Sequence, residues 1–172
     1  MPLNLTQRLL VDHAATAAFT LSLTAEERTR SRHFFLTDEG QGVYLRLDRG
    51  TVLRHGDLLQ SDDRQTVVRV VAKPEPVMTV TAQTPLDLLR AAYHLGNRHV
   101  SLEVTASYLR LAPDPVLKSM LLQLGLAVTE TIAPFAPEAG AYGHHHSADS
   151  GQDQVTVSHQ DREHHSHEHS HL

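Results

Sequence analysis

The 172-residue sequence contains no cysteine and no tryptophan, and only 5% of its residues are aromatic. Without cysteine the chain can form neither a disulfide nor a thiolate metal site. Any metal ion that it binds must therefore be held by histidine, carboxylate or backbone oxygen ligands. Histidine is the ligand type in surplus, because the chain has 14 of them.

The sequence also lacks a surplus of basic residues and a long apolar run. Its formal net charge is −5, so nucleic acid is not an expected partner. The apolar stretch AATAAFTLSL at residues 14–23 is too short to span a membrane. It follows Asp12 and His13 rather than the basic flank of a signal peptide. We therefore expect a β-strand there, no membrane association and a cytoplasmic location.

Catalytic motifs are missing as well. The sequence shows no nucleophile motif, no phosphate-binding loop and no pair of catalytic carboxylates in a recognisable setting. Histidine and aspartate are plentiful, but abundance does not define the geometry of an active site. We therefore expect a protein that is not an enzyme.

Residues 1–74 are expected to form an all-β domain. Short runs rich in leucine, β-branched and aromatic residues alternate with turn sequences such as DEGQG, DRG and RHGD. The runs are LTQRLL, AFTLSL, RHFFLT, VYLRLD and TVVRVVA. KPEP at residues 73–76 should break any strand and act as a linker, because proline cannot donate a backbone hydrogen bond.

Residues 75–143 are expected to form a second domain with the order β-α-β-β-α-β. The first helix should begin after the N-cap Thr84 and end at Gly96, and the second should begin after Asp114 and stop at Gly125. This order is ferredoxin-like, which makes the whole chain α+β. The apolar faces expected from helical spacing are Leu86, Leu89, Ala92 and Tyr93 in the first helix, and Val116, Met120, Leu121 and Leu124 in the second.

Residues 144–172 carry nine of the fourteen histidines and almost nothing apolar. Such a segment cannot offset its ordering entropy by burial, so we expect a disordered tail. Its candidate metal ligands are His144, His145, His146, His159, His164, His165, His167, His169 and His171. Imidazole suits nickel, copper and zinc, and ligands without fixed geometry should bind several ions with little selectivity. A purification tag and a pH-sensing tail without a metal role are the alternative explanations.

The other five histidines are His13, His33, His55, His94 and His99. Lone histidines are more often structural or solvated than metal ligands. His94 and His99 lie at the C-terminal end of the first predicted helix, where the helix dipole favours a cation. Their positions are therefore explained without a metal, and a ligand role is the alternative.

Three longer stretches carry a more specific resemblance. They are AAYHLGNRHVSLEV, LRLAPDPVLKSMLLQLGLAV and APFAPEAGAYGHHH, and the stretches LTQRL, GTVLRHGDLL and VVRVVAKPEPV agree with them. The combination of GNRH before a strand with PFAPEAGAY before a histidine-rich end is specific. Through these motifs the chain resembles the UreE family of urease accessory proteins over essentially its whole length.

The resemblance implies a nickel metallochaperone that collects Ni²⁺ and delivers it for assembly of the dinuclear nickel centre of urease. It implies a homodimer in which the GNRH histidine of each subunit, here His99, binds one shared metal. Nickel favours more than two ligands, so tail histidines or water should complete the shell. The implied partners are the urease apoprotein and its accessory proteins, including the GTPase UreG, and the N-terminal domain is implied to bind peptides.

One departure from the family concerns a histidine group that some members carry between the third strand of the second domain and its second helix. The corresponding stretch here, LRLAPDPVL, contains no histidine. An additional metal site there is not expected. His94 is left as a further candidate ligand.

Two other functions stay open. One is a general buffer for Zn²⁺, Cu²⁺ and Ni²⁺, because intrinsic affinity rises from nickel to copper and the tail alone cannot reject copper. The other is a protein-binding folding adaptor of the urease assembly complex, which would hold a peptide by strand addition to the β domain.

Overall fold

The computed structural model describes residues 1–9 and 16–139. His13, the end of the predicted second domain at 140–143 and the predicted tail at 144–172 lie outside the described residues. The described chain contains two β-sheets and two α-helices. Neither of these described helices is long and apolar enough to cross a membrane.

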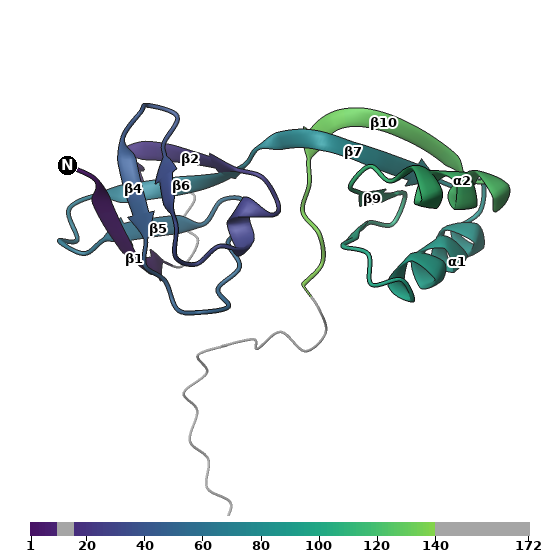
Figure 1. Ribbon diagram of the computed structural model, residues 1–172, viewed down its shortest axis with the longest axis horizontal. Coiled ribbons are helices and arrows are strands. Elements are labelled where there is room, and N and C mark those ends of the chain that lie inside the picture. The colour runs from purple at the N-terminus through teal and green to yellow at the C-terminus, as the bar shows by residue number, and fades with distance from the viewer. Residues whose placement is uncertain (10–15, 140–172) are drawn as a thin grey trace, which may run out of the picture. The chain divides into compact units, whose positions relative to one another are not determined.

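The N-terminal half forms a six-stranded sheet with the order β2-β6-β5-β1-β4-β3 (Figure 1). Its elements are β1 (Leu3–Leu9), β2 (Phe19–Leu23), a 3-10 helix η1 (Glu27–Thr29), β3 (Phe34–Leu36), β4 (Gly42–Leu45), β5 (Leu58–Ser61) and β6 (Val67–Ala72). The β1–β4 and β2–β6 pairs are parallel, and the other pairs are antiparallel. Strands therefore dominate this half, as its short apolar runs predict. The runs do not predict β5, because three of its four residues are buried and leave no alternation to detect.

Alternate side chains of this sheet build the first hydrophobic core. In β6, for example, Val68, Val70 and Ala72 are buried while the residues between them are partly exposed. The core contains Leu5, Leu21, Leu23, Val43, Leu45, Leu47, Leu53, Leu59, Val68 and Val70. A strand pattern of this kind buries one face and leaves the other in solvent.

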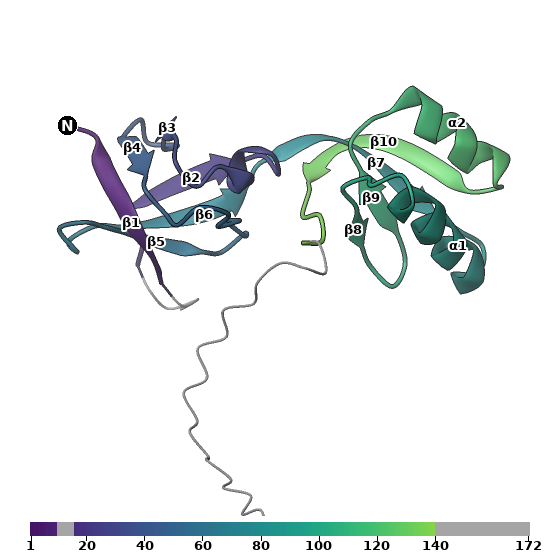
Figure 2. The ribbon, with the colours of Figure 1, turned by 60° about the horizontal axis from the view of Figure 1, so that its bottom comes forward.

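The C-terminal half forms a four-stranded antiparallel sheet with the order β10-β7-β9-β8. Its elements are β7 (Pro74–Thr81), α1 (Pro85–Gly96), β8 (Glu103–Val104), β9 (Leu109–Leu111), α2 (Pro115–Gln123) and β10 (Ala127–Pro134). The predicted β-α-β-β-α-β order is confirmed. Both helices share one core with Met78, Val80, Leu109 and Leu111 of the sheet, and Figure 2 shows them beside the β7–β10 ribbon.

The prediction that KPEP breaks any strand is wrong. Pro74 and Pro76 lie inside β7, where they pair with Pro134 and Ile132 of β10. The strand tolerates them because a residue of an antiparallel pair can direct its backbone nitrogen away from its partner strand. On the side of β7 that faces away from β10, β9 pairs with β7 only at Met78–Val80, so Pro74 and Pro76 have no partner strand there that needs an N–H donor.

The apolar face predicted for α1 is not the side that meets the sheet, and of its four residues only Ala92 packs against the core. The helix buries Leu88, Ala91 and Leu95 against the sheet, whereas Leu86, Leu89 and Tyr93 are 54%, 67% and 66% exposed. Apolar residues follow helical spacing on two sides of α1, and spacing alone does not say which side meets the sheet.

The second helix departs from its predicted face in the same way. Among the four residues of the predicted apolar set, Leu121 is buried, Met120 packs against the core, and Val116 and Leu124 are exposed. The nine residues of α2 present too few turns for the apolar pattern to single out one side.

Candidate functional site

His99 lies in the turn that ends α1, and local hydrogen bonds determine its conformation. The N–H of His99 donates to the carbonyl of Gly96 at 3.0 Å, and the N–H of Val100 donates to the carbonyl of Leu95 at 3.4 Å. These two bonds form a Schellman motif, in which the residue after the helix adopts the left-handed conformation. His99 is that residue, with a φ of +56°.

The left-handed conformation is uncommon for residues other than glycine, and within the described residues Arg64 is the other example. The position is most often glycine, because a Cβ there costs free energy. The other helix of the same domain follows the usual pattern: Gly125, with a φ of +80°, donates its N–H to Leu122, and Leu126 donates to Leu121. The same motif thus holds glycine after α2 and an exposed histidine after α1. A residue with a Cβ in this conformation suggests a role for its side chain.

The start of α1 is fixed as the sequence predicts. The Thr84 hydroxyl accepts a hydrogen bond from the Asp87 N–H and donates one to the Asp87 carboxylate at 2.6 Å. Pro85 occupies the first helical turn. At the other end, Arg98 donates to the His94 carbonyl at 2.8 Å, which satisfies one of the helix's unpaired acceptors. The helix that precedes His99 is therefore capped at both ends.

The remaining described histidines do not gather around His99. The partly buried His94 stacks edge-on against Tyr93, with ring centroids 5.5 Å apart. In the other half of the chain, His55 accepts a hydrogen bond from the Ala72 N–H, and His33 packs against Phe35. Within residues 1–9 and 16–139, no three histidine or acidic side chains come together as a metal site. His99 alone cannot complete a metal shell.

The nine histidines predicted as ligands in the tail lie outside the described residues. They are His144, His145, His146, His159, His164, His165, His167, His169 and His171. Their role therefore stays a prediction.

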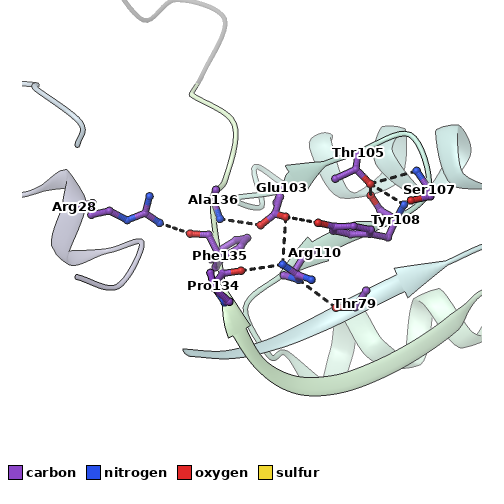
Figure 3. Close-up of polar contacts among 10 residues, drawn as sticks. All are labelled: Arg28, Thr79, Glu103, Thr105, Ser107, Tyr108, Arg110, Pro134, Phe135 and Ala136. Carbon is purple, nitrogen blue, oxygen red and sulfur yellow. Dashed lines mark hydrogen bonds and ion pairs between the residues drawn. The ribbon is translucent and has the colours of Figure 1, made fainter. Parts of the chain in front are cut away.

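A polar cluster that sequence reasoning missed lies just beyond His99 in the chain (Figure 3). Glu103 on β8 and Arg110 on β9 are paired across the strands and form an ion pair at 3.3 Å. Tyr108 donates its hydroxyl to Glu103 at 2.8 Å, and its ring lies under the Arg110 guanidinium at 4.8 Å. Hydrogen bonding to the Glu103 carboxylate, with partial desolvation, raises the pKa of Tyr108.

This cluster holds the end of β10 and the chain segment that follows it. Glu103 accepts the Ala136 N–H at 2.8 Å, and Arg110 donates to the Pro134 carbonyl at 2.9 Å. The buried Arg28, whose pKa is lowered by desolvation, donates to the Phe135 carbonyl (Figure 3). The histidine-rich end of the sequence therefore follows a segment that is tied to the fold by charged side chains.

One more hydrogen bond joins that segment to the loop after His99. The Glu138 N–H donates to the Leu102 carbonyl at 2.9 Å. PFAPE of the quoted motif PFAPEAGAY thus lies beside the strand that follows GNRH. The sequence offered a weak signal for the cluster, since Glu103 and Arg110 stand between apolar residues in SLEV and YLRL, in the part of the chain where the predicted order places two strands between the helices.

Comparison with known protein families covers both halves. The model of the UreE urease accessory protein N-terminal domain matches residues 5–73, and the model of the corresponding C-terminal domain matches residues 75–171. Together the two models account for most of the chain. Its two-sheet architecture with few helices is the two-domain architecture of that family.

Curated relatives agree with the family models. The urease accessory protein UreE of Nostoc sp. strain PCC 7120 is 58% identical over 144 residues, which are 84% of this chain and 98% of the relative. The protein of the same name from Nostoc punctiforme is 62% identical over 134 residues, or 78% and 90% of the two chains. That of Burkholderia vietnamiensis is 50% identical over 150 residues, or 85% and 74%. The chain therefore belongs to the UreE family of urease accessory proteins.

Proposed function

We propose that this urease accessory protein carries Ni²⁺ for assembly of the urease metal centre, with His99 as the ligand presented by the folded domain. The observation that carries the proposal is the conformation of His99. A histidine occupies the left-handed position that holds glycine at the end of α2, and its side chain is exposed. Imidazole in that position is available to a borderline metal ion such as nickel.

We further propose that the site is shared by two subunits. One exposed imidazole is a poor nickel site, but a two-fold axis that passes near His99 supplies a second one. Support comes from the outer side of α1, where Leu86, Leu89 and Tyr93 form an exposed apolar stripe on the helix that precedes His99. Exposed apolar patches of this kind mark protein–protein interfaces.

The histidine tail and the remaining partners belong to the same proposal. The tail histidines serve as a collector of metal ions and as additional ligands, and Zn²⁺ or Cu²⁺ can occupy them because imidazole does not discriminate strongly. The protein works in the cytoplasm with the urease apoprotein, UreG and the other accessory proteins. The strand order of residues 74–134 supports classing the metal-binding domain as ferredoxin-like.

The proposal is tested by native mass spectrometry of the full chain and of residues 1–143, each titrated with Ni²⁺. A dimer of the shorter chain should bind one nickel ion, and the full chain should bind more. Asparagine tolerates the left-handed conformation but lacks an imidazole, so His99→Asn should remove the nickel ion from residues 1–143 without unfolding the turn. His33→Asn is the matched control and should retain it.

Two results would contradict this assignment. If residues 1–143 bind no nickel, the tail itself is the site. If His99→Asn and His33→Asn bind equally well, His99 is an ordinary residue of the turn.

A general metal buffer is the second candidate function. A measured preference of the tail for one metal ion would not distinguish a buffer from a nickel carrier, because the same histidines would bind the ions in both cases. The two differ in the cell. Cells that lack this protein should lose urease activation and regain it with excess nickel if it is a nickel carrier. A buffer would leave urease activation unchanged.

A further inference from the structure

Residues 134–138 carry the chain from one edge of the second sheet to the other, and we call them the strap. In the strand order β10-β7-β9-β8, the two edges are β10 and β8. The strap begins at Pro134, the last residue of β10, and its Glu138 donates an N–H to the carbonyl of Leu102, the residue before β8. The chain therefore leaves the sheet beside β8 and not beside β10, the strand that it has just completed.

A row of polar side chains across the sheet holds the strap (Figure 3). Arg110 on β9 is in register with Thr79 on β7 and Glu103 on β8, and its guanidinium donates to both side chains. Arg110 also donates to the Pro134 carbonyl, and Glu103 accepts the Ala136 N–H. The strap is therefore fixed to β9 and to β8, the strands farthest from its own strand β10.

The attachment of the strap is largely shielded from water. The side chains of Arg110 and Glu103 are 17% and 13% exposed, and Phe135 in the strap is 4% exposed. Hydrogen bonds to charged groups are stronger where water is excluded. Pro134 and Pro137 also restrict the strap, because the fixed φ of proline limits the conformations that it would gain on release. We therefore expect the strap to stay attached in the native protein.

The last attachment point of the strap lies close to His99 along the chain. Leu102 follows His99 by three residues, and Glu138 precedes His144, the first histidine of the tail, by six. Three residues span at most about 10 Å and six at most about 20 Å. Without the strap, His144 would be ten residues from Pro134, at an edge of the sheet that is three strand spacings, or about 14 Å, away. The strap thus shortens the tether and moves its origin toward the loop of His99.

We propose that the strap places the histidine-rich end of the chain at the nickel site, and that Glu103 and Arg110 are positioning residues for it. They act through the strap and do not touch the metal ion. The inference rests on the function proposed for His99. A shorter tether that starts nearer to a site raises the effective concentration of the ligands that it carries. Releasing the strap should therefore weaken nickel binding without any change at His99 itself.

A nitroxide label tests the position of the tail in the absence of metal. The chain has no cysteine, so Ser147→Cys in the full chain provides a single site for the label. In ¹H–¹⁵N NMR spectra the label should broaden the amides of residues 99–104 more than those of residues 127–134 in β10. Ala136→Pro combined with Glu138→Pro removes two N–H donors of the strap. In this double-proline variant the broadening should shift from the first group of amides to the second.

Matched variants separate the strap from general effects of substitution. Ala139→Pro adds a proline just beyond the strap, at an N–H that makes no backbone hydrogen bond in the part of the chain that the structure describes. It should leave the broadening unchanged. Glu103→Ala removes the attachment from the side of the sheet and should act like the double-proline variant. Its control is Glu130→Ala, which removes a carboxylate that pairs with Lys118 and leaves the strap attached.

A calorimetric titration of the same full chains with Ni²⁺ connects the strap with metal binding. The double-proline variant should bind its tightest nickel ion about fivefold more weakly than the wild type. The strap change is then repeated in a chain that carries His144→Asn, His145→Asn and His146→Asn. It should have a smaller effect there, because two changes that act on one site are not additive.

The proposal is overturned if the double-proline variant leaves the broadening of residues 99–104 unchanged, or if Ala139→Pro changes it equally. It is also overturned if the strap and histidine substitutions weaken nickel binding additively, since the strap would then act only through the stability of the fold. A failure of the proposed function looks different. Nickel binding that does not depend on His99 would contradict that function, whereas the label would still report where the strap places the tail.

Discussion

Replacing His99 by glycine is expected to make the protein more stable while removing the proposed nickel ligand. The left-handed conformation costs a residue with a Cβ about 1–2 kcal/mol, and glycine avoids that cost. Glycine in turn gives the unfolded chain more freedom, which costs about 0.4–1 kcal/mol. The difference is a net stabilisation of about 0.5–1 kcal/mol, because the exposed imidazole contributes no core packing.

The assay is equilibrium unfolding in urea with a metal chelator present, at one fixed protein concentration. With a slope of about 2 kcal/mol per molar urea, the midpoint should rise by about 0.4 M with the slope unchanged. The control is the reverse substitution, Gly125→His, which places histidine in the same motif after α2. A Cβ added at Gly125 would meet no other atom within 4 Å. Its midpoint should fall by a similar amount, since the backbone conformation is the only obstacle.

A glycine variant of His99 that is less stable than the wild type would refute the reasoning. The same holds if Gly125→His has no effect, because the left-handed turn would then carry no strain in this domain. The informative combination is a rise in stability together with a loss of nickel from residues 1–143. It would mean that the turn gives up stability for the presence of an imidazole.

Three further perturbations have defined outcomes. Tyr93→Glu on the exposed stripe of α1 should dissociate the dimer in sedimentation experiments, whereas Val116→Glu on α2 should not. Glu103→Gln should lower the pKa of Tyr108 in an ultraviolet titration, because the hydrogen-bonded carboxylate is what mainly raises it. When the pKa of a tyrosine is higher in the folded than in the unfolded state, its contribution to stability is fully present below the unfolded pKa and is lost as pH rises through the folded pKa. Because the variant lowers the folded pKa of Tyr108, it should lose less stability at alkaline pH. Thr84→Ala should cost about 1 kcal/mol in thermal unfolding by removing the N-cap.

Local signals made the second domain predictable. The caps Thr84 and Asp114 each satisfy backbone N–H groups within three residues, so the helix starts can be recognised without knowing the fold. Which side of α1 meets the sheet depends on partners distant in sequence, and the exposed side is as apolar as the buried one. For that reason the spacing groups Leu89 and Tyr93 on one apolar face but does not reveal that this face is exposed.

The candidate site was predicted from resemblance rather than from spacing. His99 came from the GNRH motif, and periodicity alone made it an ordinary residue at a helix end. Its left-handed conformation could not be predicted, because the helix was already expected to end at Gly96. The Glu103–Arg110 pair depends on the register of β8 and β9, which the intervening turn sets and the apolar pattern does not reveal.

The two prolines inside β7 have a consequence for association between molecules. At residues 74 and 76 the strand pairs with β10 on one side, and its other side extends past the end of β9. A strand edge with free N–H groups is a template on which a foreign strand can grow. Pro74 and Pro76 turn their nitrogens to that side and leave it with carbonyl groups but no donors at these two residues. The β7–β10 pair is the longest strand pair of the described chain, and it extends past the end of β9. At Pro74 and Pro76 its open side offers no N–H group to which a foreign strand could bind.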